Sequence, residues 1–165
     1  MIRIQKILEP LAIAANVAQA SHTRLDHVLL MLGNLVRIFS QNLKFDEDLR
    51  LGVLASLEKR WKKADQDVFI TAMFLNPFIR GSLLNKASLT DIDLYAILER
   101  VYERVMRRTA DLDFLATFED YRLKHAEFSD ERMGLELMKS RFAAEVCSFC
   151  PFRLFLYLCE LGHPT

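Results

Sequence analysis

Residues 57–80 read LEKRWKKADQDVFITAMFLNPFIR, and this stretch holds the single Trp of the chain, its densest basic cluster and a long apolar run. Trp61 continues an apolar series with i, i+4 spacing, which predicts an amphipathic helix that ends soon after it. Asp65 then marks a break or a new N-cap. Residues 68–75 are apolar on nearly every side, so periodicity does not distinguish a buried strand from a buried helix, although length and composition favour a helix. Asn76-Pro77 ends or kinks that element.

Helical periodicity also covers the chain on the N-terminal side of this stretch. Pro10 either bends the first helix or marks its start. Ser21 or Thr23 can cap the second helix, which carries a broad apolar stripe, and Asp46 can cap the third. The helices expected here cover, in chain order, about residues 2–20, 25–39 and 47–61.

Three more helices are expected on the C-terminal side, after a loop at residues 81–88. Ser88 or Thr90 caps the first of them, which has an acidic first turn, and Asp111 starts the second. Ser129-Asp-Glu opens the third. They cover about residues 91–105, 111–123 and 129–146. The pattern predicts an all-α fold, with residues 1–165 forming a single domain of about seven or eight packed helices.

Composition limits the classes of protein that this chain can belong to. Its 165 residues are 52% hydrophobic and contain only five Gly and four Pro, which argues against disorder and against a turn-rich β architecture. Lys+Arg and Asp+Glu balance at 22 each, so nucleic acid would have to meet a local patch. No apolar run reaches the ~18 residues of a membrane-spanning helix. The three Cys, odd in number, indicate a reducing, intracellular environment.

The basic cluster, defined as Lys59, Arg60, Lys62 and Lys63, flanks Trp61 and has two interpretations. The cations can grip phosphates while Trp61 stacks on a base, which makes all five residues candidates for nucleic-acid binding. Alternatively, Trp61 ends the buried stripe of its helix and the cations solvate the outer face near the negative end of the helix dipole. An aromatic flanked by charges is ordinary in an amphipathic helix, so the second interpretation is favoured.

A second group, near the C-terminus, has the residue types of a zinc site. Cys147, Cys150, Cys159 and His163 can supply the four soft or imidazole ligands that tetrahedral zinc needs. The residues between them are strongly apolar, however, and free Cys is commonly a small core residue. The pattern therefore favours buried Cys over a metal site.

No motif for catalysis is recognisable in the sequence. A Gly-rich phosphate loop, a Gly-x-Ser-x-Gly elbow and a His-Glu-x-x-His pair are all missing. Capping explains the acidic groups at Asp46-Glu47-Asp48 and at Asp91 and Asp93, which lie at expected helix starts. We therefore expect no catalytic residues, no cofactor and no small-molecule substrate.

Several short motifs resemble hAT-family transposases, especially the domesticated or relic copies common in fungi. Leu57-Glu-Lys-Arg-Trp-Lys-Lys-Ala-Asp-Gln and the run closed by Phe74-Leu-Asn-Pro-Phe78 are similar to a family segment in which Arg-Trp precedes Leu-Asn-Pro or Leu-Asp-Pro and then a basic residue. Ile7-Leu-Glu-Pro-Leu-Ala with Gln19 resembles an earlier family helix. Tyr121 and Glu127-Phe-Ser129 resemble a later Tyr and Phe-Ser step. The resemblance covers residues 4–130, whereas residues 131–165 match poorly.

This resemblance implies a helical segment that is inserted, in the family, into a ribonuclease H-like catalytic domain with an Asp-Asp-Glu triad. The two Asp-bearing strands have no counterpart here, and the Asn-Ser-Ala-x-x-Glu-Arg segment is missing near residues 149–156. The resemblance thus implies a catalytically inactive fragment or domesticated derivative. Its remaining role would be association with itself or another transposase-like chain through apolar surface, or weak binding to the DNA backbone, in the nucleus or cytoplasm. The alternative is an unrelated helical adaptor domain that binds a partner protein.

Overall fold

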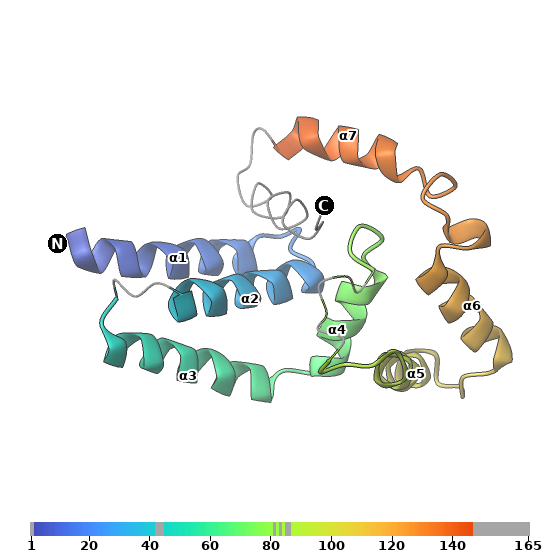
Figure 1. Cartoon of the computed structure of the whole chain (residues 1–165), viewed down its shortest axis with the longest axis horizontal. Coiled ribbons are helices and arrows are strands. Elements are labelled where there is room, and N and C mark those ends of the chain that lie inside the picture. Colours follow the sequence, from blue (N-terminus) through green and yellow to red (C-terminus); the bar gives the residue numbers. More distant parts are fainter. Residues whose placement is uncertain (1, 42–44, 81, 83, 85–86, 147–165) are drawn as a thin grey trace. The chain divides into compact units, whose positions relative to one another are not determined.

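The computed structural model describes residues 2–41, 45–80, 82, 84 and 87–146. Within these ranges the chain forms seven α-helices, one short 3-10 helix and no strand, so the predicted all-α fold is confirmed (Figure 1). In chain order these are α1 (Ile2–Gln19), α2 (Leu25–Gln41), α3 (Glu47–Lys63), α4 (Gln66–Leu75), α5 (Asp91–Met106), α6 (Leu112–Leu123), η1 (Ala126–Phe128) and α7 (Leu135–Val146).

The helices group into two compact units, Met1–Met73 (unit 1) and Phe74–Thr165 (unit 2), and the boundary between them falls within α4. Each unit has buried apolar residues of its own. The expectation that residues 1–165 make one domain stays a prediction.

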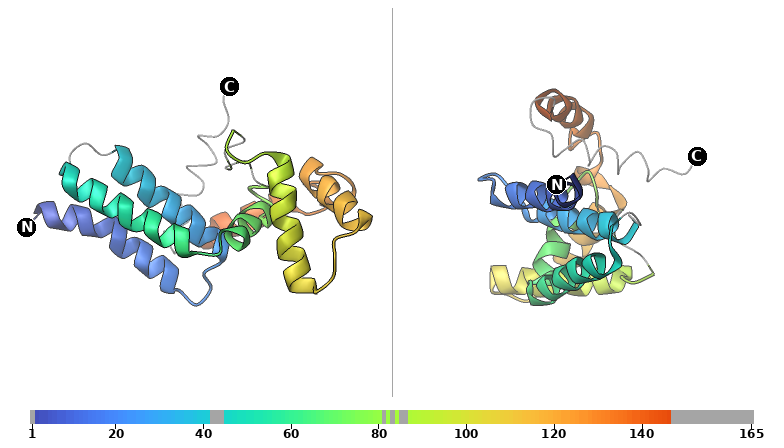
Figure 2. Two further views of the ribbon diagram at one scale, coloured as in Figure 1. Left: turned by 90° about the horizontal axis from the view of Figure 1, so that it is seen from below. Right: turned by 90° about the vertical axis from the view of Figure 1, so that its left-hand side faces the viewer.

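Unit 1 is built around three helices that run side by side, with α2 packed against both α1 and α3 (Figures 1 and 2). The centre of its core consists of Ala14, Leu35, Phe39 and Leu57. Phe39 is fully buried, and a side chain of this kind stabilises the fold by about 1.5–3 kcal/mol relative to an exposed one. The apolar spacing seen in the sequence therefore places one face of each helix against this core.

Polar side chains make contacts at the junction between α1 and α2. Arg24 donates two hydrogen bonds to Asp26, from Nε at 3.0 Å and from Nη2 at 2.5 Å. Asp26 is only 2% exposed, so this paired geometry is what allows a carboxylate to be buried there. Thr23, expected as a cap of α2, donates its hydroxyl to the carbonyl of Val17 in the last turn of α1. Since α1 begins at Ile2, Pro10 lies inside the helix and does not start it.

The ambiguous apolar run at residues 68–75 is a helix and forms most of α4. Its end is a tight turn in which the backbone carbonyl of Asn76 accepts from the amides of Ile79 (3.0 Å) and Arg80 (2.8 Å). The side chain of Asn76 is buried and accepts from the amide of Phe78 at 3.0 Å. Pro77 cannot donate a backbone hydrogen bond, and Asn side chains stabilise turns in this way, so Asn76-Pro77 stops the helix as predicted.

Two helix starts in unit 2 follow the capping chemistry expected from the sequence. Thr90 forms a capping box with Asp93: the Thr90 hydroxyl accepts from the Asp93 amide at 3.2 Å, and the Asp93 carboxylate accepts from the Thr90 amide at 2.9 Å. Asp111 caps α6 by accepting from the amide of Phe114 at 2.9 Å. These local bonds fix where α5 and α6 begin.

Aromatic side chains form much of the core of unit 2. Phe74 is 1% exposed and lies between Phe118 and Tyr121, with ring centroids 5.4 and 5.3 Å away. Tyr95 also contacts Phe118, with ring centroids 5.4 Å apart, and Phe128 contacts Tyr121 at 5.3 Å. Offset and edge-on pairs of this kind add about 0.5–1.5 kcal/mol each beyond their buried area.

The predicted start of the last helix is wrong. Ser129-Asp-Glu was expected to open it, but α7 begins at Leu135. Ser129 does cap a turn, because its hydroxyl accepts from the amide of Arg132 and its carbonyl accepts from Met133. That turn ends at Gly134, whose φ of 62° lies in the left-handed region that stops an α-helix and suits glycine.

None of the helices that the structure describes is both long enough and apolar enough to cross a membrane.

Candidate functional site

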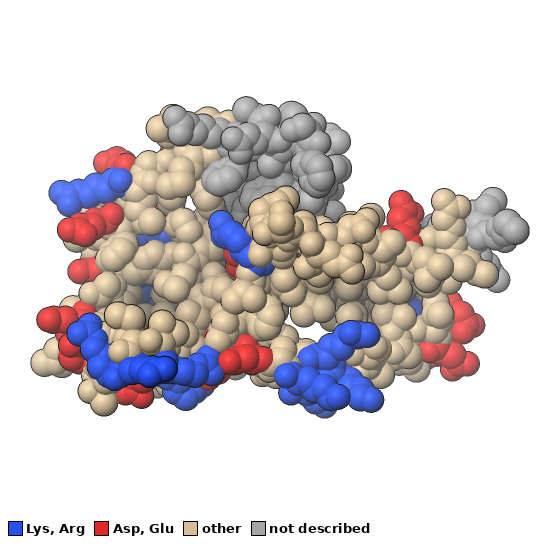
Figure 3. All heavy atoms as spheres, turned by 180° about the vertical axis from the view of Figure 1, so that it is seen from behind, with Lys and Arg blue, Asp and Glu red and all other residues tan. Residues whose placement is uncertain are grey.

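The basic cluster lies in the last two turns of α3, and all four of its side chains are exposed. Lys62 pairs with Glu58 one turn earlier, with Nζ 2.6 Å from the carboxylate. This hydrogen bond lowers the pKa of Glu58. No ion pair of Lys59, Arg60 or Lys63 occurs among the residues that the structure describes, so the cluster keeps a local excess of positive charge. Figure 3 shows Lys and Arg side chains gathered over this end of α3.

Trp61 lies at the centre of the cluster in sequence, but its side chain is half-buried and packs toward α4. Its ring meets that of Phe69 in α4 edge-on, with centroids 6.1 Å apart and planes at 61°. Gln66 also donates from Nε2 to the Trp61 carbonyl at 3.3 Å. These contacts favour an anchoring role for Trp61 at the corner between α3 and α4 over stacking on a base, which requires an accessible ring face.

This geometry suits binding to phosphates rather than reading of bases. Exposed Lys and Arg side chains on long stems can reach phosphate oxygens without a fixed register. The negative end of the α3 dipole, where the cluster lies, stabilises the cations by about 0.3–1 kcal/mol each. The same dipole gives no attraction to an anion, so any affinity must come from the side-chain charges and stay weak.

A second group of arginines lies at the end of α5. Arg108 donates from Nε to the Tyr102 hydroxyl at 2.5 Å and its guanidinium lies 5.3 Å from the centre of that ring. Arg107 ends the helix in the left-handed conformation, at φ 54°. Arg100 and Arg104 also have interaction partners. Arg108 thus packs back on the last turns of α5, with its guanidinium against the Tyr102 ring.

The residues of the predicted zinc site, Cys147, Cys150, Cys159 and His163, lie outside the described residues. Within the described ranges, no three His, Cys, Asp or Glu side chains are grouped so that they could hold a metal ion.

The polar centre of unit 2 is Arg80, a residue that the sequence did not single out. Its side chain is 5% exposed and comes from the turn after α4. It donates to three backbone carbonyls: Nε to Pro77 at 3.2 Å, Nη1 to Tyr121 at 3.3 Å, and Nη2 to Phe128 at 2.6 Å. One side chain thus joins the end of α4 to the end of α6 and to η1.

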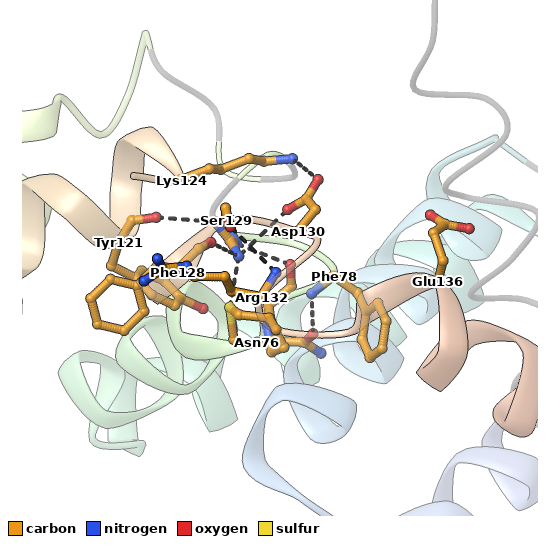
Figure 4. Close-up of polar contacts among 12 residues, drawn as sticks. Asn76, Phe78, Tyr121, Lys124, Phe128, Ser129, Asp130, Arg132 and Glu136 are labelled. Atoms are coloured by element: carbon orange, nitrogen blue, oxygen red, sulfur yellow. Dashed lines mark hydrogen bonds and ion pairs between the residues drawn. The ribbon is translucent and has the colours of Figure 1, made fainter. Parts of the chain in front are cut away.

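Charged and aromatic side chains complete the surroundings of Arg80. Asp130 lies 3.5 Å from its Nη2 and accepts from Lys124 Nζ at 2.7 Å (Figure 4). The Lys124 hydrogen bond lowers the pKa of Asp130, and Arg80 contributes a smaller effect in the same direction. The Arg80 guanidinium also lies 5.0 Å from the centre of the Tyr121 ring. Burial raises the pKa of Tyr121 to about 12.

These contacts make Arg80 a structural centre that closes the loop between α6 and α7. The only signal in the sequence is a basic residue directly after the apolar Phe78-Ile79 pair, and it says nothing about the acceptors. The structure therefore keeps the basic cluster together on one helix end, and it adds Arg80 as a residue that sequence reasoning missed.

Comparison of the chain with protein-family models, with curated proteins and with solved structures finds no match.

Proposed function

We propose that this chain is a catalytically inactive derivative of a hAT-type transposase that binds the DNA backbone weakly, in the nucleus, through the end of α3. The observation that carries the DNA-binding part is the exposure of the four cations of the basic cluster, three of them without an ion pair among the described residues. The hAT ancestry is supported by the sequence motifs around Trp61 and Asn76-Pro77, and nuclear localisation follows from that ancestry.

The expected binding does not depend on DNA sequence. Cations that contact phosphates release condensed counterions, and each neutralised phosphate contributes about 0.9 to the slope of log K against log salt concentration. Four cations therefore set an upper limit of roughly 3.6 on that slope. Non-specific contacts of this kind have dissociation constants of about 10⁻⁴–10⁻⁶ M at physiological salt.

A salt titration of duplex binding tests this proposal. The variant replaces Lys59, Arg60, Lys62 and Lys63 by Gln, and the matched control removes four exposed cations of unit 2, namely Arg104, Arg107, Arg132 and Lys139. We expect the α3 variant to lose most of its affinity and salt dependence while the control stays close to wild type. Equal losses in both would show only a dependence on net charge, and unchanged affinity in the α3 variant would remove α3 as the binding site.

Protein association is the second candidate, and it agrees with both the transposase-derived and the adaptor interpretations. α1 exposes Ile4 (64%) and Leu8 (53%) one turn apart, next to the buried face that carries Ala14. Sedimentation velocity over a range of concentrations would reveal self-association, with Leu8→Glu as the variant that should abolish it. If the sedimenting species has the mass of a monomer at all concentrations, self-association is excluded.

A further inference from the structure

Unit 2 contains a cavity of about 400 Å³ beside the turn that follows α4. Its lining includes the buried side chains of Phe74, Ile79 and Leu94. Pro77, Phe78 and Leu89 extend the apolar lining. A largely apolar cavity of this size, with a few polar groups, has the usual character of a site for a small organic molecule.

The polar part of the lining is mainly cationic. Arg80, Arg122 and Lys124 line the cavity together with a single carboxylate, that of Asp91. Asp91 accepts from Arg122 Nη1 at 3.2 Å, so its charge is already compensated. Glu119 and Asp130, beside the cavity, likewise pair with Arg122 and Lys124. An anion is therefore favoured here only through the hydrogen-bond donors that these pairs leave free, whereas a cation would meet no unpaired carboxylate in the lining.

Two of these cations keep hydrogen-bond donors available. Arg122 has five N–H groups and uses three, for Asp91 and for both of its bonds to Glu119 at 3.2 and 2.6 Å. Lys124 uses one of its three, for Asp130. No acceptor for the others occurs among the described residues. The side chains of Arg122 and Lys124 are 30% and 53% exposed, so both can be reached from solvent.

We propose that this cavity binds a small carboxylate with an apolar body. The carboxylate is held at the rim by Arg122 and Lys124, where a guanidinium can donate two parallel hydrogen bonds to it. The apolar body lies against Phe74, Ile79 and Leu94. This site uses no residue of α3, so it stands or falls independently of DNA binding.

Titration of the isotope-labelled full chain, followed by amide NMR shifts, tests the site with defined probes. Octanoate is expected to bind saturably, with the largest shifts at Ile79, Leu94 and Arg122. Hexanoate should bind on the order of tenfold more weakly, because each buried methylene contributes about fourfold in affinity. Octan-1-ol lacks the charge, so it should also bind about tenfold more weakly, since a hydrogen bond to a charged group is stronger than a neutral one. Equal binding of octanoate and octylamine, or no saturation at millimolar octanoate, would overturn the proposal.

Variants separate this site from general attraction to apolar surface. Leu89→Trp fills the cavity and should abolish octanoate binding, whereas Arg122→Gln and Lys124→Gln should weaken it about tenfold while octan-1-ol binding stays unchanged. Lys139→Gln is the matched control, because Lys139 is exposed and lies outside the cavity lining. If Lys124→Gln and Lys139→Gln weaken octanoate equally, the rim cations play no specific role and the proposal is wrong. Because Lys124 is a surface residue, its variant remains informative even if Leu89→Trp does not fold.

Discussion

Nη2 of Arg80 donates a 2.6 Å hydrogen bond to the backbone carbonyl of Phe128, which lies 48 residues further along the chain. The same guanidinium reaches the carbonyl of Tyr121 across 41 residues. A buried cation that satisfies two distant carbonyls replaces the water that those carbonyls would otherwise need. The ends of α6 and η1 therefore depend on a residue outside both.

Replacing Arg80 by Ala should destabilise unit 2. The Phe128 carbonyl loses its donor, while the Tyr121 carbonyl keeps only the Lys124 amide at 3.4 Å. An unsatisfied buried group costs about 1–3 kcal/mol, so we expect the free energy of unfolding of unit 2 to fall by about that amount. Hydrogen exchange measured on peptides from residues 112–140 would report it. Arg132→Ala, at an exposed position nearby, is the control and should stay within about 0.5 kcal/mol of wild type. Protection unchanged in Arg80→Ala would contradict the role assigned to this side chain.

Tyr121 should make the protein less stable at alkaline pH. Burial raises its pKa from 10.0 to about 12, and its hydroxyl has no hydrogen-bond partner among the described residues. Between those two pH values the unfolded state releases the phenol proton and the folded state retains it, so stability falls as pH rises. A phenolate absorbance titration should show a component near pH 12 that belongs to Tyr121; burial also raises the pKa of Tyr95, so the Tyr121→Phe variant assigns the component.

Tyr121→Phe should remove both the late ionisation and the unsatisfied hydroxyl. We expect a gain of about 1 kcal/mol at neutral pH, because a buried polar group without a partner is costly. The control is Tyr102→Phe, since the Tyr102 hydroxyl accepts from Arg108 and its removal should bring no gain. A destabilised Tyr121→Phe would indicate that its hydroxyl has a partner after all.

Two glycines should respond to alanine in opposite directions. Gly52 lies in the middle of α3, and a Cβ there would meet no heavy atom within 4 Å. Gly52→Ala should therefore stabilise unit 1 by about 0.5–1 kcal/mol, since alanine favours the helix. Gly134→Ala should cost about 1 kcal/mol, because its φ of 62° is strained for any residue with a Cβ. Thermal unfolding of both variants checks the pair, and a gain in Gly134→Ala would contradict the left-handed turn.

The fluorescence of Trp61 should report folding of unit 1 but not DNA binding. The chain has one Trp, so all tryptophan emission comes from this position. Its ring packs on Phe69, and we therefore expect duplex DNA to leave the emission unchanged at saturation. Strong quenching by DNA would show base stacking and restore the alternative in which Trp61 is part of the interface. Phe69→Ala should shift the emission to longer wavelength, since it exposes the indole to water.

The parts of the fold that depend on neighbouring residues were predictable. The Thr90–Asp93 capping box and the Asp111 cap involve residues three apart in sequence, so their side-chain types are enough to place both helix starts. The start of α7 was not predictable in this way. Ser129 does cap a turn, and only the backbone angle of Gly134 shows that this turn does not continue into the helix. The run at residues 68–75 lacked a polar face, and this left helix and strand undecided until α4 was seen.

The candidate sites differ in the same way. The basic cluster is contiguous in sequence, so its grouping on α3 followed directly from helical spacing. The cavity combines the turn at 77–80 with the start of α5 and the end of α6. These segments are more than ten residues apart in sequence, so no local pattern encodes their grouping. Whether a charged side chain such as Arg80 is buried depends on acceptors brought in by tertiary packing, and periodicity carries no information about them.

All three of the carbonyls that Arg80 binds belong to the main chain. Every amino acid supplies a backbone carbonyl. The hydrogen bond from Arg80 would therefore still form if Phe128 or Tyr121 were replaced, provided that the backbone keeps its path. Natural variation at the accepting positions would thus leave these three bonds intact, whereas the contacts of Arg80 with Asp130 and with the Tyr121 ring do depend on side-chain type. Paired substitutions would leave no trace of the three backbone bonds, and a distant relative would be recognised by a lone arginine after a helix-ending proline rather than by a matched pair.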